Sequence, residues 1–343
     1  MGHDRWLPVF RIISDGGTHP AAELAATLAI PIADIHLQVE TLRGLGLKVL
    51  GDPKNGFRLP YPVDLFDAAE LLASLPKWCR ERIVSCEVAG QVDSSNTRLL
   101  EQAPPGDGQV RVFLAEYQSA GRGRRGRNWL SPPASGICLS LAVACDASPQ
   151  NLAALPLALG VATLRALTTL GIEPVGIKWP NDLVAKGKLA GILVELRNTA
   201  DNRLHLVAGL GLNYRLPGPP GESMAGDWRD ITGMSDGAPP SRNSLAQQIL
   251  PEWVAALDTF MLQGLAPFLQ ELRRADICRN QQVDLVSDTA ITHGVCLGIA
   301  DDGCLLLEAE GKIRRIVAGD ISLRPTRAKS WPGRDLIARW ARR

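Results

Sequence analysis

The sequence predicts an α+β protein of several domains: an N-terminal winged helix-turn-helix, a central mixed α/β domain and a small C-terminal β-barrel. Residues 6 to about 60 read as short apolar helices followed by a hairpin, strand-like and helical runs alternate from about 80 to 275, and short strands separated by turns fill 282–324. The 343 residues are enough for two or three domains. We place them at 1–62, 63–275 and 276–330, followed by a basic tail at 331–343.

The N-terminal prediction depends on hydrophobic periodicity and one turn. Three apolar segments occur, and the third places Ile35, Val39 and Leu42 at helical spacing. A turn rich in Asp, Pro, Asn and Gly then joins two short strand-like runs, which is typical of a hairpin. The segments are 10–13, 21–28 and 32–45, and the hairpin spans 48–59.

In the central region, apolar runs of strand type alternate with helical stretches, which favours a mixed α/β domain. Residues 217–240 are rich in Gly, Pro, Asp and Ser and are expected to form a loop. The expected strands are 110–114, 137–143, 175–179, 191–196 and 205–212, and the expected helices are 64–75, 95–101, 151–170, 244–262 and 267–275.

Composition and charge exclude several classes of protein. Hydrophobic residues make up 45% and charged residues 21% of the chain, as in ordinary globular proteins. The net charge of +1 gives no general attraction to nucleic acids or membrane surfaces, so any anion site must be local. The N-terminus lacks an apolar signal region, and the longest apolar stretch, 152–164, is too short to span a bilayer. We therefore expect a soluble, cytoplasmic protein without a membrane partner.

The seven cysteines are odd in number, scattered, and form no C-x-x-C pair. This pattern fits neither a disulfide framework nor a zinc site. We expect reduced, mostly buried thiols.

The segment 115–129 carries the strongest chemical signal. It contains the literal pattern G-x-G-x-x-G at Gly121, Gly123 and Gly126, after a predicted strand. A dinucleotide-binding turn would open a helix at the last glycine, whereas Ser-Pro-Pro follows within five residues. Four arginines in positions 122–127 instead favour a flexible loop that closes over an anionic nucleotide, because guanidinium groups grip phosphate and carboxylate oxygens. A solvated basic loop is the alternative.

Two further segments bring polar groups to strand ends. Residues 178–183 end a strand with a lysine, a turn and two short polar side chains, and 186–195 place Lys188 just before an apolar strand. Taken singly, turn chemistry and a lysine that extends to solvent explain both segments. Taken with the arginine loop, they would build a positive cage for a phosphate that is being displaced.

Together these segments resemble the successive motifs of biotin protein ligases, in the bifunctional form that doubles as the biotin operon repressor. The motifs are 92–96, 121–127 with Trp129, 178–182 and 188–195, and they occur in the expected order. The resemblance covers about residues 6–325. Ser95 stands where the family usually has threonine, and it keeps the hydroxyl group.

The resemblance implies an ATP-dependent, AMP-forming ligase. The family joins biotin to ATP, releases pyrophosphate, and passes biotin from biotinyl-5′-AMP to a lysine of a biotin carboxyl carrier protein. Mg²⁺ is expected to accompany ATP and to be held by phosphates and waters, without a side-chain ligand that we can name. The resemblance also implies a class II synthetase-like central domain and an SH3-like C-terminal barrel.

The same resemblance assigns site residues. Catalytic roles fall to Arg122, Arg124, Lys188 and Asp182. Biotin contacts fall to Ser94, Ser95, Asn96, Gln118, Arg122, Gly123, Arg124, Lys188 and Gly191, and nucleotide contacts to Arg124, Arg127, Trp129, Lys178, Asn181, Asn213 and Arg324. Two assignments keep an alternative: Asp182 could deprotonate the acceptor lysine or be an ordinary turn residue, and Arg324 with Asp320 could close the site or form a surface salt bridge.

Whether the N-terminal domain binds DNA is a separate question from its fold. Residues 1–64 hold six basic and seven acidic side chains, which is a poor electrostatic match to phosphates. The expected recognition helix, 33–43, offers His36, Gln38 and Arg43 as readers of bases or phosphates. We expect operator binding by a homodimer that forms once the adenylate is bound. The alternative is a domain that regulates or steadies the ligase.

Two further functions compete with the ligase. One is a ligand-sensing transcription factor that binds biotinyl-adenylate without transferring biotin. The other is lipoate attachment by a related fold. Pyrophosphate exchange with candidate acids separates biotin from lipoate as the substrate. Label transfer to a carrier domain separates a ligase from a sensor, which would bind operator DNA without transfer.

Overall fold

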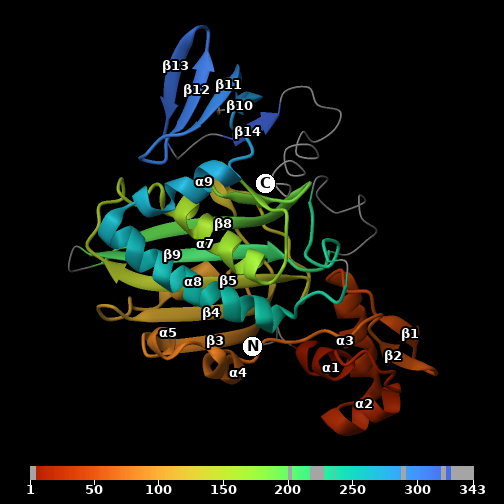
Figure 1. Cartoon of the computed structure of the whole chain (residues 1–343). Helices are drawn as coiled ribbons and strands as arrows, with labels where there is room; N and C mark the ends of the chain where they lie inside the picture. The colour runs from red at the N-terminus through yellow and green to blue at the C-terminus, as the bar shows by residue number, and fades with distance from the viewer. Residues whose placement is uncertain are drawn as a thin grey trace.

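The structure, a computed structural model, describes residues 5–199, 203–216, 228–235, 237–286, 291–317 and 322–325, the last of these by main chain alone. Figure 1 shows three parts: a small helical part near the N-terminus, a large central sheet with helices, and a second sheet later in the chain. Their order agrees with the predicted α+β architecture. The domain boundaries at residues 62, 275 and 330 stay predictions.

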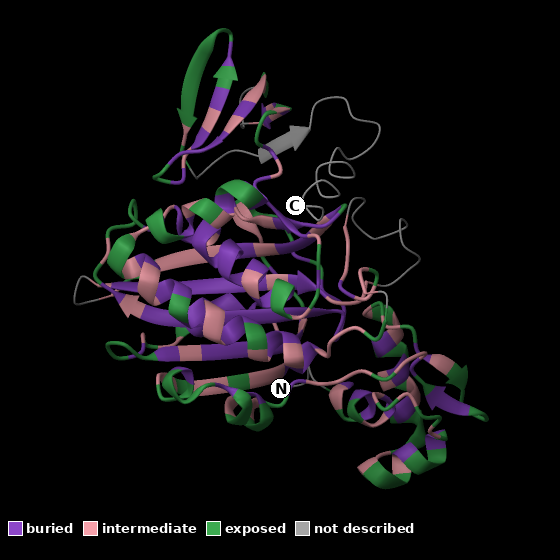
Figure 2. Ribbon diagram, viewed as in Figure 1, coloured by how far each residue is buried: buried purple, intermediate pink, exposed green. Residues whose placement is uncertain are grey.

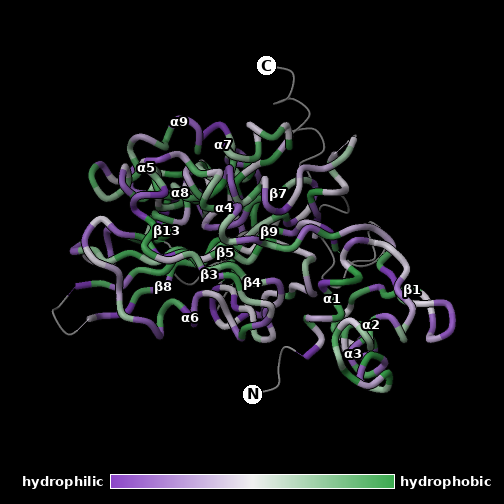
Figure 3. Tube along the Cα trace, turned by 90° about the horizontal axis from the view of Figure 1, so that it is seen from below, coloured by the Kyte–Doolittle hydropathy of each residue, from purple (hydrophilic) through white to green (hydrophobic). Residues whose placement is uncertain are grey.

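The described residues of the N-terminal part form three helices and a two-stranded antiparallel sheet, as predicted. Ile35, Val39 and Leu42 are fully buried on one side of the third helix. They belong to a core that is largely separate from that of the central sheet, and Figure 3 shows this part standing to one side. The elements are α1 (Leu7–Ile13), α2 (Ala21–Leu28), α3 (Ile32–Gly44), β1 (Leu50–Asp52) and β2 (Gly56–Arg58).

Seven described strands pair in one mixed sheet, in the order β3-β4-β5-β9-β8-β7-β6. Among these strands β3 and β4 run parallel, and the other neighbours are antiparallel. The five predicted strands are confirmed, whereas β3 and β7 were not expected. The strands are β3 (Ile83–Val92), β4 (Val110–Gln118), β5 (Gly136–Cys145), β6 (Gly176–Lys178), β7 (Asp182–Val184), β8 (Lys188–Asn198) and β9 (Leu204–Asn213).

Helices lie on both faces of this sheet. Helices α7 and α8 pack together on one face, where Figure 2 shows many buried residues, and α6 packs on β4, β5 and β9 from the other face. The Asp67 side chain caps α4, so this helix is shorter than the predicted 64–75. The elements are α4 (Ala68–Ser74), α5 (Lys77–Arg80), α6 (Ser95–Glu101), α7 (Leu155–Thr169), α8 (Arg242–Gln263) and α9 (Leu269–Ala275), with 3₁₀ turns at Arg124–Gly126 and Ala266–Phe268.

The C-terminal part is an antiparallel sheet with the strand order β13-β12-β11-β10-β14. Its closure into a barrel stays a prediction. The indole Nε1 of Trp179 donates to the Gly303 carbonyl oxygen at 3.0 Å and so joins this sheet to the central domain. The strands are β10 (Gln281–Val286), β11 (Ile291–Ile299), β12 (Leu305–Ala309), β13 (Lys312–Ile316) and β14 (Ser322–Pro325).

The seven cysteines, all within the described part of the chain, are free thiols, and five of them are buried. This agrees with the sequence. Within the described residues, no single helix is long and apolar enough to cross a membrane. Helices α2 and α3 reach the required length and hydropathy only as a pair, which is bent by 105°.

A buried ion pair joins the start of the central domain to its sheet. Arg242 and Glu116 have 0% and 3% exposed side chains, and Arg242 Nη1 donates to Glu116 Oε2 at 2.7 Å. The same guanidinium group donates to the carbonyl oxygens of Gly136 and Asp64, while Glu116 Oε1 accepts from the Phe66 amide. Because these partners satisfy both charged groups, the pair fixes the segment 64–66 against β4 and β5.

We expect Arg242→Met to lower the free energy of unfolding by about 3–5 kcal/mol, because Glu116 would then be buried without a cation. Urea unfolding followed by tryptophan fluorescence measures this. The control is Arg98→Met, which breaks a surface pair with Glu101 whose side chains are 52% and 61% exposed and should cost less than about 1 kcal/mol. Equal losses in the two variants would contradict the role given to Arg242.

Candidate functional site

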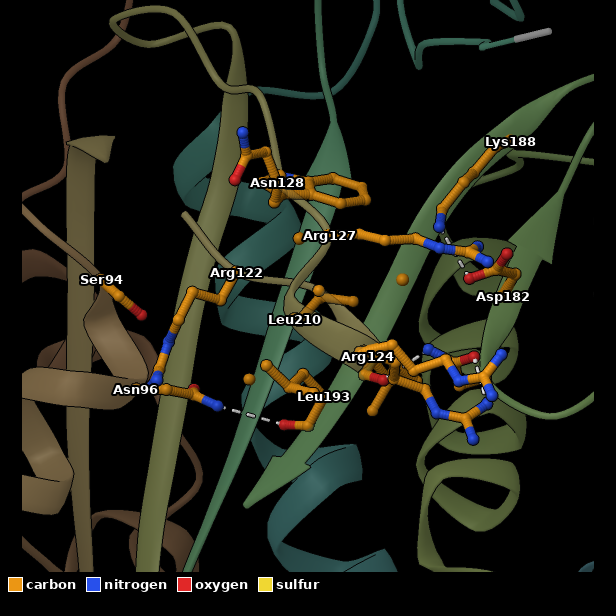
Figure 4. Close-up of a pocket in the computed structure, with 18 of the residues that line it drawn as sticks. Ser94, Asn96, Arg122, Arg124, Arg127, Asn128, Asp182, Lys188, Leu193 and Leu210 are labelled. Atoms are coloured by element: carbon orange, nitrogen blue, oxygen red, sulfur yellow. Dashed lines mark hydrogen bonds and ion pairs between the residues drawn. The ribbon is translucent and has the colours of Figure 1, made fainter. Parts of the chain in front are cut away.

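A cavity of about 320 Å³ lies between the start of α6, the arginine loop and strands β8 and β9 (Figure 4). Apart from Asn213, the structure brings together at this cavity every predicted ligand-binding and catalytic residue whose side chain it describes. The lining residues that were predicted are Ser94, Ser95, Asn96, Gln118, Arg122, Gly123, Arg124, Arg127, Trp129, Lys178, Asn181, Asp182, Lys188 and Gly191. Trp228, Gly209 and Gly211 also line it and were not predicted.

Glycines on two neighbouring strands form the floor of the cavity. Gly191 of β8 is directly opposite Gly211 of β9. A Cβ atom on Gly211 would lie 2.3 Å from Trp129 Cε2, and one on Gly209 would lie 2.2 Å from Asn96 Oδ1. Both separations are far below van der Waals contact, so the glycines allow these side chains to approach the sheet. Glycine at alternate positions of a strand was a signal in the sequence that we did not use.

The start of α6 supplies three buried polar residues to one end of the cavity. Ser94 is the N-cap, and its Oγ accepts from the Thr97 amide at 3.5 Å. The amide and the hydroxyl of Ser95 lie 2.8 and 3.0 Å from Gln118 Oε1. Gln118 Nε2 in turn lies 3.3 Å from the Sγ of Cys138, and burial raises the pKa of this thiol to about 11. The polar side chains at this end of the cavity are therefore hydrogen-bonded to one another, and the Cys138 thiol beside them is uncharged at neutral pH.

Asn96 is held by partners from two strands. Its Nδ2 donates to the Leu193 carbonyl oxygen at 3.2 Å and to Glu195 Oε2 at 2.9 Å. Its Oδ1 lies 2.6 Å from Ser140 Oγ. These contacts fix the orientation of the amide. Ser140 and Glu195 were not assigned roles from the sequence, although Glu195 lies in the segment 186–195 that we singled out.

The arginine loop is a tight turn between β4 and β5. The Gly123 amide donates to the Arg127 carbonyl oxygen at 2.7 Å, and the Trp129 amide donates to that of Gly121 at 2.8 Å. Gly126 has a φ of +69°, in the left-handed region that glycine enters without strain. The loop holds a single 3₁₀ turn and then leads into a strand. This geometry excludes the dinucleotide-binding turn, which requires a helix at this point.

The arginines of the loop point to different sides of the cavity. Figure 4 shows Arg122 directed toward Asn96, and Arg127 extended across the cavity toward Lys188 and Asp182. Arg124 Nη1 lies 3.4 Å from Asn181 Oδ1. Of the described residues that line the cavity, six are cationic and one, Asp182, is a carboxylate. The cavity is therefore electropositive and suited to an anionic ligand.

Lys188, Asp182 and two tryptophans form the other end of the cavity. Lys188 Nζ lies 2.9 Å from Asp182 Oδ1 and 5.5 Å from the ring centre of Trp129. The rings of Trp129 and Trp228 stack at 5.1 Å with an angle of 27° between their planes. Flat aromatic faces beside cations suit a planar base attached to phosphates. Trp228 falls within the segment 217–240 that was predicted as a loop, where composition gave no sign of a binding residue.

One predicted residue is placed differently, and another is described by its main chain alone. Asn213 does not line the cavity, because its Nδ2 donates to the carbonyl oxygens of Lys188 and Arg229 at 3.1 and 3.0 Å. It holds the main chain at the cavity wall instead. The main chain of Arg324 pairs with Asp284 in the C-terminal sheet. The side chain of Arg324, and Asp320 as a whole, lie outside the described residues.

The predicted DNA-contacting residues lie on α3, and the structure gives one of them another partner. Arg43 donates from Nε to the Val49 carbonyl oxygen at 3.1 Å and from Nη2 to that of Gly51 at 2.9 Å. It therefore ties α3 to the hairpin. His36 and Gln38 are half-buried. Leu37 and Glu40, which the sequence did not suggest as contacts, are exposed on α3.

We expect Gly211→Ala to displace Trp129 and to break its stacking with Trp228, because the added Cβ would overlap the indole ring. Overpacking of this kind costs about 1–3 kcal/mol of stability. Near-ultraviolet circular dichroism should lose the signal of the stacked pair. The control is Gly44→Ala, since a Cβ at Gly44 meets nothing within 4 Å. A spectrum unchanged by Gly211→Ala would contradict this description of the floor.

Comparisons with known proteins agree with this geometry. A profile of the Biotin/lipoate A/B protein ligase family matches residues 89–213, and one of the Biotin protein ligase C terminal domain matches 280–324. The bifunctional ligase/repressor BirA of Escherichia coli is 35% identical over 322 residues, which cover 93% of this chain and 97% of that protein. The biotin–[acetyl-CoA-carboxylase] ligase of Mycobacterium tuberculosis is 34% identical and covers 68% of this chain and 87% of its own length.

A solved structure shows the same fold. A point mutant of the Aquifex aeolicus biotin protein ligase, in complex with biotin, superposes with a TM-score of 0.60 and is 26% identical. The match covers 71% of this chain and 99% of that one. With the family motifs gathered at one electropositive cavity, and with relatives matched along almost the whole chain, this protein belongs to the biotin protein ligase family.

Proposed function

We propose that this cavity binds biotin and ATP, joins them as biotinyl-5′-AMP, and delivers the biotinyl group to a lysine of a biotin carboxyl carrier protein. The observation that carries the proposal is the cavity itself, in which hydrogen-bonding groups occupy one end and cations and aromatic rings the other. The match of residues 280–324 to the biotin ligase C-terminal domain favours biotin over lipoate.

In the first step, a carboxylate oxygen of biotin attacks the α-phosphorus of ATP. A bond forms between these atoms, the bond from phosphorus to the bridging oxygen breaks, and pyrophosphate leaves. Two anions must approach each other, so cations that neutralise both are the main requirement. We assign the biotin carboxylate to Arg122 and Arg124, and the α-phosphate to Lys188 with Arg127 beside it. The three arginines come from the tight loop between β4 and β5, and Lys188 comes from the start of β8. These supports hold the cations in place before the substrates bind.

The hydrogen-bonding end suits the ureido ring of biotin, which needs donors and acceptors together. Ser94, Ser95, Asn96 and Gln118 offer both kinds of group. The stacked pair of Trp129 and Trp228 offers a flat face for adenine. Lys178 and Asn181 line the nucleotide side of the cavity.

In the second step, the ε-amine of the acceptor lysine attacks the biotinyl carbonyl carbon, an amide bond forms, and AMP leaves. The amine must first lose a proton. Asp182 is a candidate base, but its carboxylate already pairs with Lys188 at 2.9 Å. We propose that its main task is to hold Lys188 toward the phosphate, with proton removal as its second task.

Mg²⁺ is proposed to enter with ATP. Among the described residues there is no group of three or more His, Cys, Asp or Glu side chains that could hold a metal ion. The cation would therefore depend on phosphate oxygens and waters, and it would supply further charge neutralisation at the phosphates. The chain's own steps do not require a side-chain ligand to it.

A second role, as a DNA-binding repressor, is supported by one observation beyond the family. Helices α2 and α3 are followed by a hairpin that Arg43 ties to α3, an arrangement of the winged helix-turn-helix type. The Escherichia coli relative, matched over 93% of this chain, is named a ligase/repressor. Lys48, Lys54 and Arg58 are exposed in and beside the hairpin and are better placed for phosphates than Arg43.

We expect Arg124→Ala to slow biotin-dependent pyrophosphate exchange by about 10²–10³-fold, since it removes a cation from the developing charge. Retention of biotinyl-adenylate should fall in parallel, while the melting temperature stays the same. Arg98→Ala, on the outer surface of α6, is the control. Unchanged adenylate affinity in Arg124→Ala would overturn the assignment, and exchange with lipoate but not with biotin would overturn the substrate.

Dimerisation is expected to follow adenylate binding, because operator readers usually pair two half-sites. Sedimentation velocity, with and without biotinyl-adenylate, measures it. A shift from monomer to dimer on ligand addition is the expected result. A monomer under both conditions would count against the proposed homodimer and leave the ligase proposal intact.

A further inference from the structure

One carboxylate beside the cavity has no role in the steps above. Glu195 lies on β8, on the same face as Gly191 and Leu193, because alternate residues of a strand point the same way. It does not line the cavity, and its side chain is 24% exposed. Both of its oxygens lie 3.0 Å from Arg122 Nη2, and Oε2 also accepts from Asn96 Nδ2 at 2.9 Å.

Glu195 thereby joins the arginine loop to the start of α6. Arg122 is the first arginine of the loop, and its guanidinium reaches toward Asn96 in Figure 4. The loop is also held by hydrogen bonds within its own main chain and by the contact between Arg124 and Asn181. The ion pair with Glu195 adds a charged anchor to the Arg122 side chain, which is 42% exposed.

Glu195, together with the Leu193 carbonyl oxygen, also determines which way the Asn96 amide faces. The carboxylate accepts hydrogen bonds and cannot donate them, so it requires Nδ2 of Asn96 on its side. Oδ1 is then directed to Ser140 at 2.6 Å, and Ser140 Oγ lies 2.8 Å from Ser95 Oγ. Ser95 continues the chain to Gln118. The Glu195 carboxylate thus helps to order a row of hydrogen-bonding groups along the biotin end.

At each end of the cavity a carboxylate forms an ion pair with a cation. At one end Asp182 pairs with Lys188 at 2.9 Å, and at the other Glu195 pairs with Arg122. Each carboxylate sets the position of a cation and lowers the repulsion among the cations that surround the cavity. The difference is that Glu195 stands behind the lining residues, where it acts through Arg122 and Asn96.

We propose that Glu195 is a positioning residue of the ligase: it fixes the guanidinium of Arg122 and the amide of Asn96 before biotin binds. This inference rests on the proposed function for its kinetic consequence, while its structural consequence applies to the free protein. The effect falls on biotin rather than on ATP, because both groups that Glu195 holds lie at the biotin end.

Two variants separate the two contacts. Glu195→Gln keeps an oxygen that accepts from Asn96 but loses the ion pair with Arg122, and Glu195→Ala loses both. The matched control is Glu101→Gln, which removes a surface pair with Arg98 at 3.5 Å and lies outside the cavity.

The first test uses the ligand-free protein and trypsin, which cleaves after arginine. Loss of the anchor increases the time that the loop 122–127 spends open, so cleavage in this loop should be roughly fivefold faster in both Glu195 variants than in Glu101→Gln. Mass spectrometry locates the cut. Equal cleavage rates in the three variants would overturn the anchoring of Arg122, whatever reaction the protein catalyses.

The second test is pyrophosphate exchange with each substrate varied. Glu195→Ala should raise KM for biotin by roughly tenfold with little change in KM for ATP, and Glu195→Gln should recover part of the loss. Equal rises in both KM values, or a fall in kcat alone, would overturn the positioning role. Absence of exchange in the unaltered protein would instead refute the proposed function. The trypsin experiment would then still test whether Glu195 holds Arg122 in place.

Discussion

The cavity exists because β8 and β9 carry no side chains where Trp129 and Asn96 approach the sheet. Gly191 and Gly211 form a cross-strand pair, and Gly209 precedes Gly211 by two residues on the same face. Glycine weakens a strand through backbone entropy, and three on one floor would destabilise an ordinary sheet. Here each occupies a position where a larger residue would collide with a side chain of the cavity or crowd it. The glycines therefore weaken the two strands, but they allow the site to lie close to the main chain of the sheet.

The concentration of cations is the second constraint. Six cationic side chains line a cavity of about 320 Å³ among the described residues, and such a group repels itself strongly in a partly buried place. The structure reduces this repulsion without giving up the charge. Asp182 pairs with Lys188 and Glu195 pairs with Arg122, and the arginines of the loop point to different sides. The remaining positive field is what two anionic substrates need in order to meet.

Local pattern predicted much of this molecule. The helices of the N-terminal part, the five long or buried strands, and a loop with four arginines follow from periodicity, composition and spacing. The sequence predicted a flexible loop, and its tight turn was not foreseen. Strand β3 escaped prediction because it is an edge strand with mostly half-buried side chains, so its sequence lacks clear alternation. The bonds of Arg43 to the hairpin escaped prediction for another reason: an arginine on a helix gives no sign that a hairpin carbonyl will accept its hydrogen bonds.

The site was predicted well where motifs gather along the chain and poorly where partners come from distant segments. Ser140 reaches Asn96 across 44 positions and Glu195 reaches it across 99, and neither contact has a local signature. Trp228 is distant from Trp129 in the sequence, and the two rings stack only in the folded chain. The motifs therefore identified most of the groups that line the cavity, whereas the groups that hold them in place required the structure.

The C-terminal part and the segment that follows the N-terminal part are each attached within two residues of the cavity. Trp179, which bonds to Gly303 of the C-terminal part, adjoins Lys178, and Glu116, which holds the segment 64–66, lies two residues before Gln118 on β4. A strand transmits a shift of its main chain over such short distances, because its hydrogen bonds allow little independent movement of neighbours. The strands that line this cavity therefore also hold the C-terminal part and the segment 64–66. The ligase site and the segment that leads from the proposed DNA-binding part are thus built on the same central sheet.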